Sequence, residues 1–529
     1  MKWPADAAPA RLLGSRAFAA IVLVALVALS YYERTRALNA SYWIDEGISV
    51  GIAKHSLTEI PGVLRQDGSP PLYYLILNLW TGAFGTREVV THDLSVVFAL
   101  ACIPAGYWAA SVWSRGAGLA VATLAAFSPF LDIHALETRM YSLVALLGML
   151  AAGAYVRGFV FRRARFVPVF AVLLALMLYT HNWSLFLALG AGLGILALAA
   201  VRRDLRLLRD GVLAGAGALV LYAPWIPSLL YQAKHTGAPW SARPSLSGLA
   251  DVTDALIGPD YLVAIVVLTA GAGLVLAVAR GKPEDRQAIL ALGLALVVGV
   301  AVAFVVAQVS RGWAARYFAV FVAPMFLLLG LGASRARVVG VAGLIAFAVI
   351  SYNPVTPSPY FKSNAEAVAN EVNPSLRAGD VVLSPQPEQV PLLRHYLVDE
   401  LRYADSMGWV ADPRVTDWRD GLDRLRAADQ PAAIEPVLRG VGSRQRLVLI
   451  RPIVRGQFGW RAPWTRLVRI RSGQIQRALA RDERFREVGT YRGRTLVRSR
   501  RVGVVATLYE RRSRRETSPR GPVFRLSGY

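Results

Sequence analysis

The sequence predicts an α-helical polytopic membrane protein with about eleven transmembrane helices, followed by a carboxyl-terminal α/β domain outside the membrane. Three observations support this prediction. The 529-residue chain is 55% hydrophobic and only 18% charged, a balance that soluble domains rarely have. Its mean hydropathy is +0.41, and long apolar blocks such as 289–306 would form helices that are apolar on every side. After residue 352 the composition changes to charged residues, turns and short strand-like runs.

The apolar blocks define the predicted spans. Basic residues precede the first block and no small-residue cleavage site follows it, which indicates a retained anchor rather than a signal peptide. A further apolar stretch at 70–84 is short and contains Asn78, which favours an interfacial or re-entrant helix within one long external loop, about 33–88. The predicted spans are 17–32, 89–111, 116–131, 141–158, 166–181, 183–201, 211–231, 260–280, 287–309, 316–334 and 336–352.

Basic loops indicate the orientation of the chain. Clusters of arginine and lysine occur at 157–165, 202–209, 280–286 and 335–337. All of them lie in the cytoplasm only if the amino terminus is cytoplasmic and the segment after residue 352 is external. The sequence therefore predicts a multi-pass plasma-membrane protein with an extracytoplasmic carboxyl-terminal domain. The net charge of +24 reflects these loops and the carboxyl-terminal third, so it predicts contact with membrane lipids and not with nucleic acid.

Composition also divides the chain into predicted domains. The transmembrane domain comes first, and a proline-rich linker, an external α/β domain and a basic disordered tail follow it. Within the α/β domain we expect strands at 380–384 and 446–451 and helices at 364–372 and 418–428. The predicted domains are 1–352, 353–359, 360–510 and 511–529.

Two groups of polar residues lie at external span ends and are candidates for chemistry. The adjacent carboxylates Asp45 and Glu46 follow Trp43 shortly after the first span, and His55 lies farther along the same loop. The alternative is a solvated loop with an interfacial aromatic residue. One cysteine, Cys102, lies inside an apolar block, so no disulfide framework is expected.

The second group occupies the short loop between the third and fourth predicted spans. This loop contains Asp132, His134, Glu137 and Arg139, and polar groups at membrane depth are costly unless they are paired or functional. The alternative is a local pair, Glu137 with Arg139 or Asp132 with His134. Further polar residues, His181 among them, reach the same face from other loops, although a lone histidine in a turn is more often structural.

Carboxylates and cations on one face suit sugar transfer. A carboxylate takes the proton of an acceptor hydroxyl, and cations stabilise the departing phosphate. A lipid-linked donor would place its apolar tail among the spans and its phosphate beside arginine. The sequence contains no P-loop, dinucleotide fingerprint, cysteine-rich metal site or G-x-S-x-G elbow, which favours a lipid-phosphate donor over a nucleotide sugar.

The order of these motifs resembles the GT-C superfamily of membrane glycosyltransferases, especially the branch with protein O-mannosyltransferases and lipid A aminoarabinose transferases. The matching residues are Trp43–Glu46, Gly68–Tyr74, Ser128-Pro129, Glu137–Tyr141 and Arg316-Tyr317. The resemblance covers roughly residues 17–330. It implies a GT-C-like membrane domain and a polyprenyl-phosphate-linked sugar donor.

The resemblance also implies roles for individual residues. Asp45 would be the general base, and Glu46 would orient the acceptor or Asp45. Direct displacement by one base implies inversion at the anomeric carbon. The resemblance leaves a divalent cation open, and the stretch 91–95 departs from relatives that carry an arginine there. The residues expected to bind substrate are Asp132, Glu137, Arg139, Tyr141, His181, Arg316, Tyr317 and His55.

The predicted function is therefore transfer of a mannose- or arabinose-like sugar from a polyprenyl-phosphate carrier to an extracytoplasmic glycan, lipid or protein acceptor in cell-envelope synthesis. A transporter or flippase of lipid-linked sugars is the main alternative, because many spans and cavity-facing charges fit it too. A non-catalytic scaffold is a third, and it predicts that Asp45 and Glu137 can be replaced without effect.

Overall fold

The computed structural model describes residues 16–353, 357–358, 362–443, 445–453, 462–493 and 503–512. The chain divides into two compact units. The membrane unit comprises Met1–Asn39 and His55–Pro357, and the carboxyl-terminal unit comprises Ala40–Lys54 and Ser358–Tyr529. The segment Ala40–Lys54 thus packs with the carboxyl-terminal unit, although the sequence places it in the first loop of the transmembrane domain. The predicted tail beyond residue 512 and most of the predicted linker lie outside the described residues.

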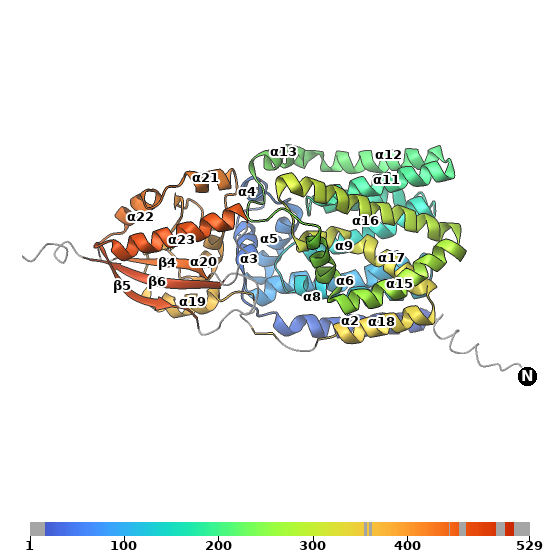
Figure 1. Cartoon of the computed structure of the whole chain (residues 1–529), viewed down its shortest axis with the longest axis horizontal. Helices are drawn as coiled ribbons and strands as arrows, with labels where there is room; N and C mark the ends of the chain where they lie inside the picture. The colour runs from blue at the N-terminus through green and yellow to red at the C-terminus, as the bar shows by residue number, and fades with distance from the viewer. Residues whose placement is uncertain are drawn as a thin grey trace, which may run out of the picture. The chain divides into compact units, whose positions relative to one another are not determined.

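Long apolar helices make up most of the membrane unit (Figure 1). Within the described residues, eight helical segments are long and apolar enough to cross a membrane. The chain is therefore a multi-pass membrane protein. They are α2 with η1 (Arg16–Ala37), α6 (Glu88–Ala110), α9 with η2 (Tyr141–Val160), α11 (Ser184–Arg202), α12 to α13 (Leu205–His235), α15 (Asp260–Arg280), α16 (Pro283–Ser310) and η4 with α17 (Ala315–Arg335).

The remaining predicted spans coincide with shorter or bent helices. Helices α7 (Arg115–Ala126) and α8 (Pro129–Ala135) bend by 51° at their break and would together give a ninth span. Helices α10 (Phe166–Leu178) and α18 (Val338–Ser351) are apolar but shorter than a full span. Every predicted span therefore contains a helix, whereas the count of about eleven spans stays a prediction.

Shorter helices lie between the spans. Helix α5 (Leu72–Phe84) has 13 residues and occupies the stretch for which the sequence predicts an interfacial or re-entrant helix. It packs against α6, and Trp80 Nε1 donates to the Val90 carbonyl oxygen at 2.7 Å. Its depth in a membrane stays a prediction. The other short helices of this unit are α4 (Ile60–Asp67) and α14 (Ser247–Ile257).

Small residues let the apolar helices approach closely. A Cβ atom on Gly273 of α15 would lie 1.7 Å from the carbonyl oxygen of Gly332 in α17. A Cβ atom on Gly190 of α11 would lie 2.6 Å from the carbonyl oxygen of Ala295 in α16. Helix association in lipid depends on such close packing, because lipid is as apolar as the side chains. A larger residue at either glycine would force two helices apart.

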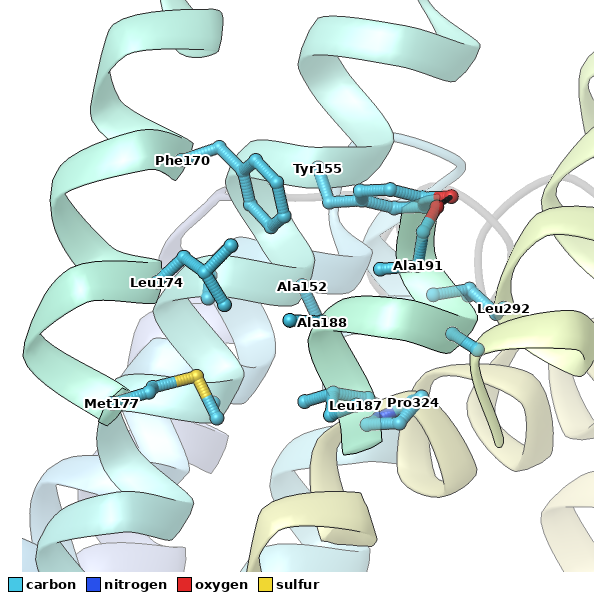
Figure 2. A pocket seen from close by; sticks show the side chains of 13 residues that line it. Ala152, Tyr155, Phe170, Leu174, Met177, Leu187, Ala188, Ala191, Leu292 and Pro324 are labelled. Atoms are coloured by element: carbon cyan, nitrogen blue, oxygen red, sulfur yellow. Dashed lines mark hydrogen bonds between the residues drawn. The ribbon is translucent and has the colours of Figure 1, made fainter. Parts of the chain in front are cut away.

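An apolar cavity of about 30 Å³ lies among α9, α10, α11, α16 and α17 (Figure 2). Phe170, Leu174 and Met177 of α10 form one wall of the cavity. The Tyr155 hydroxyl, which also borders it, donates to the Ala191 carbonyl oxygen at 3.0 Å. With this hydroxyl already hydrogen-bonded, the lining favours an apolar group over water.

A mixed sheet forms the centre of the carboxyl-terminal unit. Its described residues give six strands in the order β3-β2-β1-β4-β6-β5. Strand β1 pairs in parallel with both β2 and β4, and the other pairs are antiparallel. The strands predicted at 380–384 and 446–451 are β1 and β4. The strands are β1 (Val381–Ser384), β2 (Arg402–Asp405), β3 (Gly408–Trp409), β4 (Arg446–Ile453), β5 (Phe485–Tyr491) and β6 (Gly503–Arg511).

Helices cover both faces of this sheet (Figure 1). Side chains alternate along β1, so Val382 faces the core under α19 and α20, and Val381 faces the core under α22 and α23. Strand β1 is buried on both sides, which explains its uninterrupted apolar run. The helices are α19 (Ala365–Val372), α20 (Val390–Tyr396), α21 (Gly421–Ala427), α22 (Glu435–Gly440) and α23 (Pro463–Arg481).

Helix α3 (Ile44–Ala53) joins this unit from the amino-terminal part of the chain. Tyr42 and Val50 belong to the same core cluster as α19 and α20. A Cβ atom on Gly47 would lie 2.6 Å from the Cα atom of Leu392 in α20, so the two helices touch through their backbones. The fold therefore makes α3 part of the α/β unit.

Candidate active site

The predicted catalytic pair lies in the first turn of α3. Trp43 is the N-cap residue, and Asp45 and Glu46 follow within that turn. Carboxylates are favourable there because the backbone N–H groups of the first turn have no partner within the helix. Glu46 Oε2 accepts a hydrogen bond from the Trp43 N–H at 3.2 Å.

The two carboxylates have different surroundings. Glu46 is fully buried, and the ammonium of Lys362 lies 2.8 Å from its Oε1 and 2.7 Å from its Oε2. Asp45 is only partly buried, and its charge contributes to raising the pKa of Glu388, after burial as the main cause. Because Lys362 neutralises Glu46, Asp45 is the better candidate for accepting a proton.

Asp132 is held by an arginine from the first span. Arg34 Nε lies 2.8 Å from Asp132 Oδ1, and Arg34 itself is 1% exposed. Arg34 also donates to the Ala125 carbonyl oxygen at the end of α7. This geometry favours a structural role for Asp132 in joining α2, α7 and α8.

Glu137 is paired with the histidine in its own loop. His134 Nδ1 lies 2.9 Å from Glu137 Oε2, and both side chains are buried. The Thr138 hydroxyl donates to the Thr91 hydroxyl at 2.7 Å, within the stretch that departs from the family pattern. The loop that carries Arg139 is therefore fixed on both sides of Glu137.

Arg139 lies among tyrosines. Its guanidinium donates to the Tyr74 hydroxyl at 3.2 Å, and its Cζ is 6.0 Å from the centre of the Tyr141 ring. Tyr74 and Tyr141 are both fully buried. Apolar rings around a guanidinium strengthen its attraction for an anion, because they exclude water.

His181 packs against two tyrosines of the predicted substrate-binding set. Its ring centre is 6.0 Å from that of Tyr141 and 5.0 Å from that of Tyr317. The His181 side chain is buried. Its Nδ1 accepts a hydrogen bond from the Trp183 N–H at 3.1 Å.

Arg316 approaches from the start of η4. Its Cζ lies 4.8 Å from the centre of the Trp240 ring and 5.6 Å from that of the Tyr317 ring. The membrane unit therefore brings together most of the predicted substrate-binding residues. We call Arg139, Tyr141, His181, Arg316 and Tyr317 the arginine–aromatic cluster.

Three other predicted residues are not members of this cluster. Asp45 and Glu46 belong to the carboxyl-terminal unit, whereas the arginine–aromatic cluster belongs to the membrane unit. The His55 side chain is 6% exposed, and its carbonyl oxygen accepts a hydrogen bond from Asn78 Nδ2 at 2.8 Å. His55 therefore takes part in a hydrogen bond between the first loop and helix α5.

Sequence reasoning missed Lys362, Tyr74 and Trp240. Tyr74 lies in the stretch Gly68–Tyr74, which matches the family pattern. The sequence gives no sign, however, that Tyr74 contacts Arg139. Lys362 and Trp240 carry no local signal, because their partners Glu46 and Arg316 lie far away in the sequence.

The described residues do not fit a protein-bound divalent cation. They contain no group of three or more histidine, cysteine, aspartate or glutamate side chains that could hold a metal ion. Asp132 is paired with Arg34, and Glu137 with His134. Divalent cations need several oxygen ligands, which these paired carboxylates do not supply.

Comparison with known proteins identifies the fold. No protein-family model and no curated protein matches the sequence. ArnT from Cupriavidus metallidurans in the apo state matches with a TM-score of 0.61 and 15% identity, over 93% of this chain and 98% of that chain. ArnT bound to undecaprenyl phosphate gives 0.61 and 13%, with the same coverage of 93% and 98%.

A third solved structure, of a different protein, has the same fold. The arabinofuranosyltransferase AftD from Mycobacteria matches with a TM-score of 0.54 and 15% identity, over 94% of this chain and 40% of that chain. The chain therefore has a GT-C fold with a carboxyl-terminal α/β unit, as the sequence predicts.

Proposed function

We propose that this protein is a glycosyltransferase that moves a sugar from a polyprenyl-phosphate carrier to a hydroxyl group of an extracytoplasmic acceptor. The arginine–aromatic cluster carries this proposal: the buried His181 ring packs against Tyr141 and Tyr317, the rings that Arg139 and Arg316 contact. Two guanidinium groups beside a water-poor aromatic wall form a binding site for a phosphate monoanion or dianion. The fold shared with ArnT, of which one structure contains undecaprenyl phosphate, supports the same donor class.

Apolar residues lie about one to two helical turns from the arginine–aromatic cluster, an arrangement that suits a lipid-linked donor. Met177 precedes His181 by about one helical turn, and Leu187 follows Trp183 by about one turn. Pro324 lies about two turns beyond Tyr317. Three segments thus carry a residue of the polar cluster, or its neighbour Trp183, and a residue of the cavity about one to two helical turns apart. A donor with a phosphate head and a prenyl chain has the same order of polar and apolar parts.

Asp45 is the proposed general base. It takes the proton of the acceptor hydroxyl while that oxygen attacks the anomeric carbon of the donor. The bond from the anomeric carbon to the phosphate oxygen breaks, and polyprenyl phosphate leaves with the bonding electrons. Arg139 and Arg316 stabilise the charge that grows on the phosphate. Displacement from the opposite face gives inversion.

The sugar and the acceptor follow from the resemblance only. We assign a mannose- or arabinose-like sugar and a glycan, lipid or protein acceptor of the cell envelope. The orientation belongs to the same proposal, with the amino terminus in the cytoplasm and the carboxyl-terminal unit outside. Asp132 and His55 are assigned supporting roles, because each is engaged in a structural contact.

The test offers purified protein a set of polyprenyl-phosphate sugars together with a cell-envelope extract as acceptor. We expect release of polyprenyl phosphate and labelled product, and loss of both in Arg316→Ala. Arg286→Ala is the matched control, because Arg286 is exposed at the far end of α16. A flippase would move the lipid-linked sugar across a vesicle membrane without releasing polyprenyl phosphate, and that result would replace the proposal.

A further inference from the structure

Helix α3, which carries Asp45, is attached to the carboxyl-terminal unit at several points. The Ser41 hydroxyl donates to Glu366 Oε2 at 2.6 Å, and the Tyr42 N–H donates to the Tyr396 hydroxyl at 2.6 Å. Both partners lie more than 300 residues later in the sequence, with separations of 325 and 354. The segment therefore depends on the carboxyl-terminal unit for its position.

Glycines on one face of α3 make this attachment close. Gly47 and Gly51 are separated by one helical turn and lie on the same side of the helix. A Cβ atom on Gly47 would lie 2.6 Å from the Leu392 Cα atom, and one on Gly51 would lie 2.0 Å from the Arg414 carbonyl oxygen. Backbone meets backbone on this face, so little displacement of α3 is possible while the contact holds.

A buried ion pair fixes the end of α3 that carries the carboxylates. The side chains of Lys362 and Glu46 are 1% and 0% exposed, and their charged atoms are 2.7 Å apart. Glu46 Oε1 accepts from Lys362, and Glu46 Oε2 accepts from Lys362 and from the Trp43 N–H. These donated hydrogen bonds hold the buried carboxylate in place.

We infer that Lys362 is a positioning residue: by neutralising Glu46 it fixes the first turn of α3, and with it Asp45, on the carboxyl-terminal unit. This inference rests on the proposed role of Asp45 as the general base. Asp45 and Glu46 are neighbours in one helical turn, so a shift of Glu46 moves Asp45 too. A misplacement of about 1 Å can lower a reaction rate about 100-fold.

The charge of Lys362, more than its size, is the property that matters. Lys362→Met keeps an unbranched apolar stem but leaves Glu46 as a buried carboxylate without its cation. Removing one partner of a buried ion pair is far more disruptive than removing both. The double variant Glu46→Gln/Lys362→Met removes both charges and keeps both shapes. We therefore expect it to restore the position of α3.

Hydrogen exchange tests the attachment without reference to activity. In the full-length protein, we expect Lys362→Met to accelerate exchange in residues 44–53 at least about tenfold, with β1 and β4 unchanged. The double variant should return exchange close to the wild-type rate. Lys54→Met is the matched control, because Lys54 is an exposed lysine at the other end of the same helix. Unchanged exchange of α3 in Lys362→Met overturns the inference.

Turnover per folded molecule tests the consequence for catalysis. We expect kcat to fall about 100-fold in Lys362→Met and to recover at least about tenfold in the double variant, with undecaprenyl phosphate binding unchanged in both. A normal kcat in Lys362→Met overturns the positioning role.

Failure of a variant to fold and failure of the proposed function can both be distinguished from failure of the inference. Lys362→Met could fail to yield folded protein. In that case, a double variant that is folded and active supports the inference, and a double variant that is unfolded overturns it. If the wild-type protein transfers no sugar from any carrier, the proposed function fails, whereas the exchange result still decides whether Lys362 holds α3.

Discussion

His134 Nδ1 lies 2.9 Å from Glu137 Oε2, three residues along a buried loop of the membrane unit. The Ser95 hydroxyl donates to the Glu137 carbonyl oxygen at 2.6 Å, and the Ser142 hydroxyl donates to the His134 carbonyl oxygen at 3.0 Å. These contacts fix the loop immediately before Arg139. We therefore expect Glu137 to act mainly by placing Arg139.

The first prediction concerns Glu137→Gln. The amide keeps the shape of the carboxylate but weakens the charge-assisted hydrogen bond with His134, at a cost of about 1–3 kcal/mol. We expect a lower Tm and weaker binding of undecaprenyl phosphate, measured on one preparation. Glu284→Gln, a partly exposed change on α16, is the control. A lower Tm with unchanged phosphate binding would contradict the placing role.

The second prediction separates the adjacent carboxylates of α3. Asp45→Asn should lower kcat about 10²–10⁴-fold with little change in Tm, because asparagine cannot accept the acceptor proton. Glu46→Gln should instead lower the stability by about 3–5 kcal/mol, because it leaves the Lys362 ammonium buried without its partner. Turnover and Tm of both variants decide the assignment. Full activity in Asp45→Asn together with an inactive but stable Glu46→Gln would move the base to Glu46.

Much of the membrane unit could be predicted from the sequence, because lipid imposes a simple requirement on it. Backbone groups in hydrocarbon must be bonded within their own segment, so every long apolar block became a helix. Helices α10 and α18 differ from the full spans only in their length. Hydropathy does not distinguish them, because both helices are strongly apolar. In the other unit, strands β1 and β4 were predictable because both are short, apolar and preceded by turns.

Pairing of charged residues could not be predicted in the same way. The sequence offered neighbours such as Asp132 and His134, whereas the structure pairs Asp132 with Arg34 and Glu46 with Lys362. These partners are separated by 98 and 316 residues, and no local pattern encodes a contact over such distances. The membership of α3 in the carboxyl-terminal unit depends on the same kind of contact.

The third prediction concerns the pH dependence of stability in the carboxyl-terminal unit. Burial raises the pKa of Asp405 from 3.8 to about 7, and it raises the pKa of Glu388 as well. Between the unfolded and folded pKa values of Asp405, the folded state binds more protons than the unfolded state. Stability therefore falls as the pH rises from about 4 to about 7. Each pKa unit corresponds to about 1.4 kcal/mol. Hydrogen exchange of β1 at pH 5 and pH 8, corrected for intrinsic rates, measures the loss.

Asp405→Asn provides the control for this pH dependence. The Asp405 carboxylate accepts a hydrogen bond from the Met407 N–H at 2.6 Å, and an asparagine oxygen can accept the same bond. The variant should therefore lose part of the slope and be more stable than the wild type at pH 8. Asp399→Asn, an exposed change in the same unit, should keep the full slope. Equal slopes in the wild type and Asp405→Asn would disprove the prediction.

The fourth prediction concerns orientation. Arg162 pairs with Asp204 and Asp210 at 3.3 and 3.1 Å, which ties together two of the basic loops. If these loops are cytoplasmic, a cysteine at position 163 is protected from an impermeant reagent added to intact cells, and a cysteine at position 399 reacts. Replacing the buried Cys102 first removes the background. Labelling at position 163 without labelling at position 399 would reverse the proposed orientation.

The last prediction concerns the geometry of phosphate binding by Arg316. Its guanidinium lies 4.8 Å from the Trp240 ring and 5.6 Å from the Tyr317 ring, so flat faces surround a flat cation. A planar fork can bond two phosphate oxygens at once, whereas a lysine ammonium binds as a point charge. We therefore expect Arg316→Lys to lower kcat/KM about tenfold or more although the charge is kept, and Arg316→Ala to be worse.

A role for Arg316 in anchoring η4 makes a different prediction, so the same Arg316→Lys preparation decides between the two. Loss of an anchor should lower the yield or the Tm and leave turnover per folded molecule normal. Loss of a phosphate ligand should leave Tm near the wild-type value and raise the Kd for undecaprenyl phosphate, because the charge that grows on the leaving phosphate is stabilised less well. Arg286→Lys, at the other end of the preceding helix, controls for the general effect of replacing arginine. Normal kinetics in Arg316→Lys would remove the phosphate role and leave the aromatic contacts as the function of this side chain.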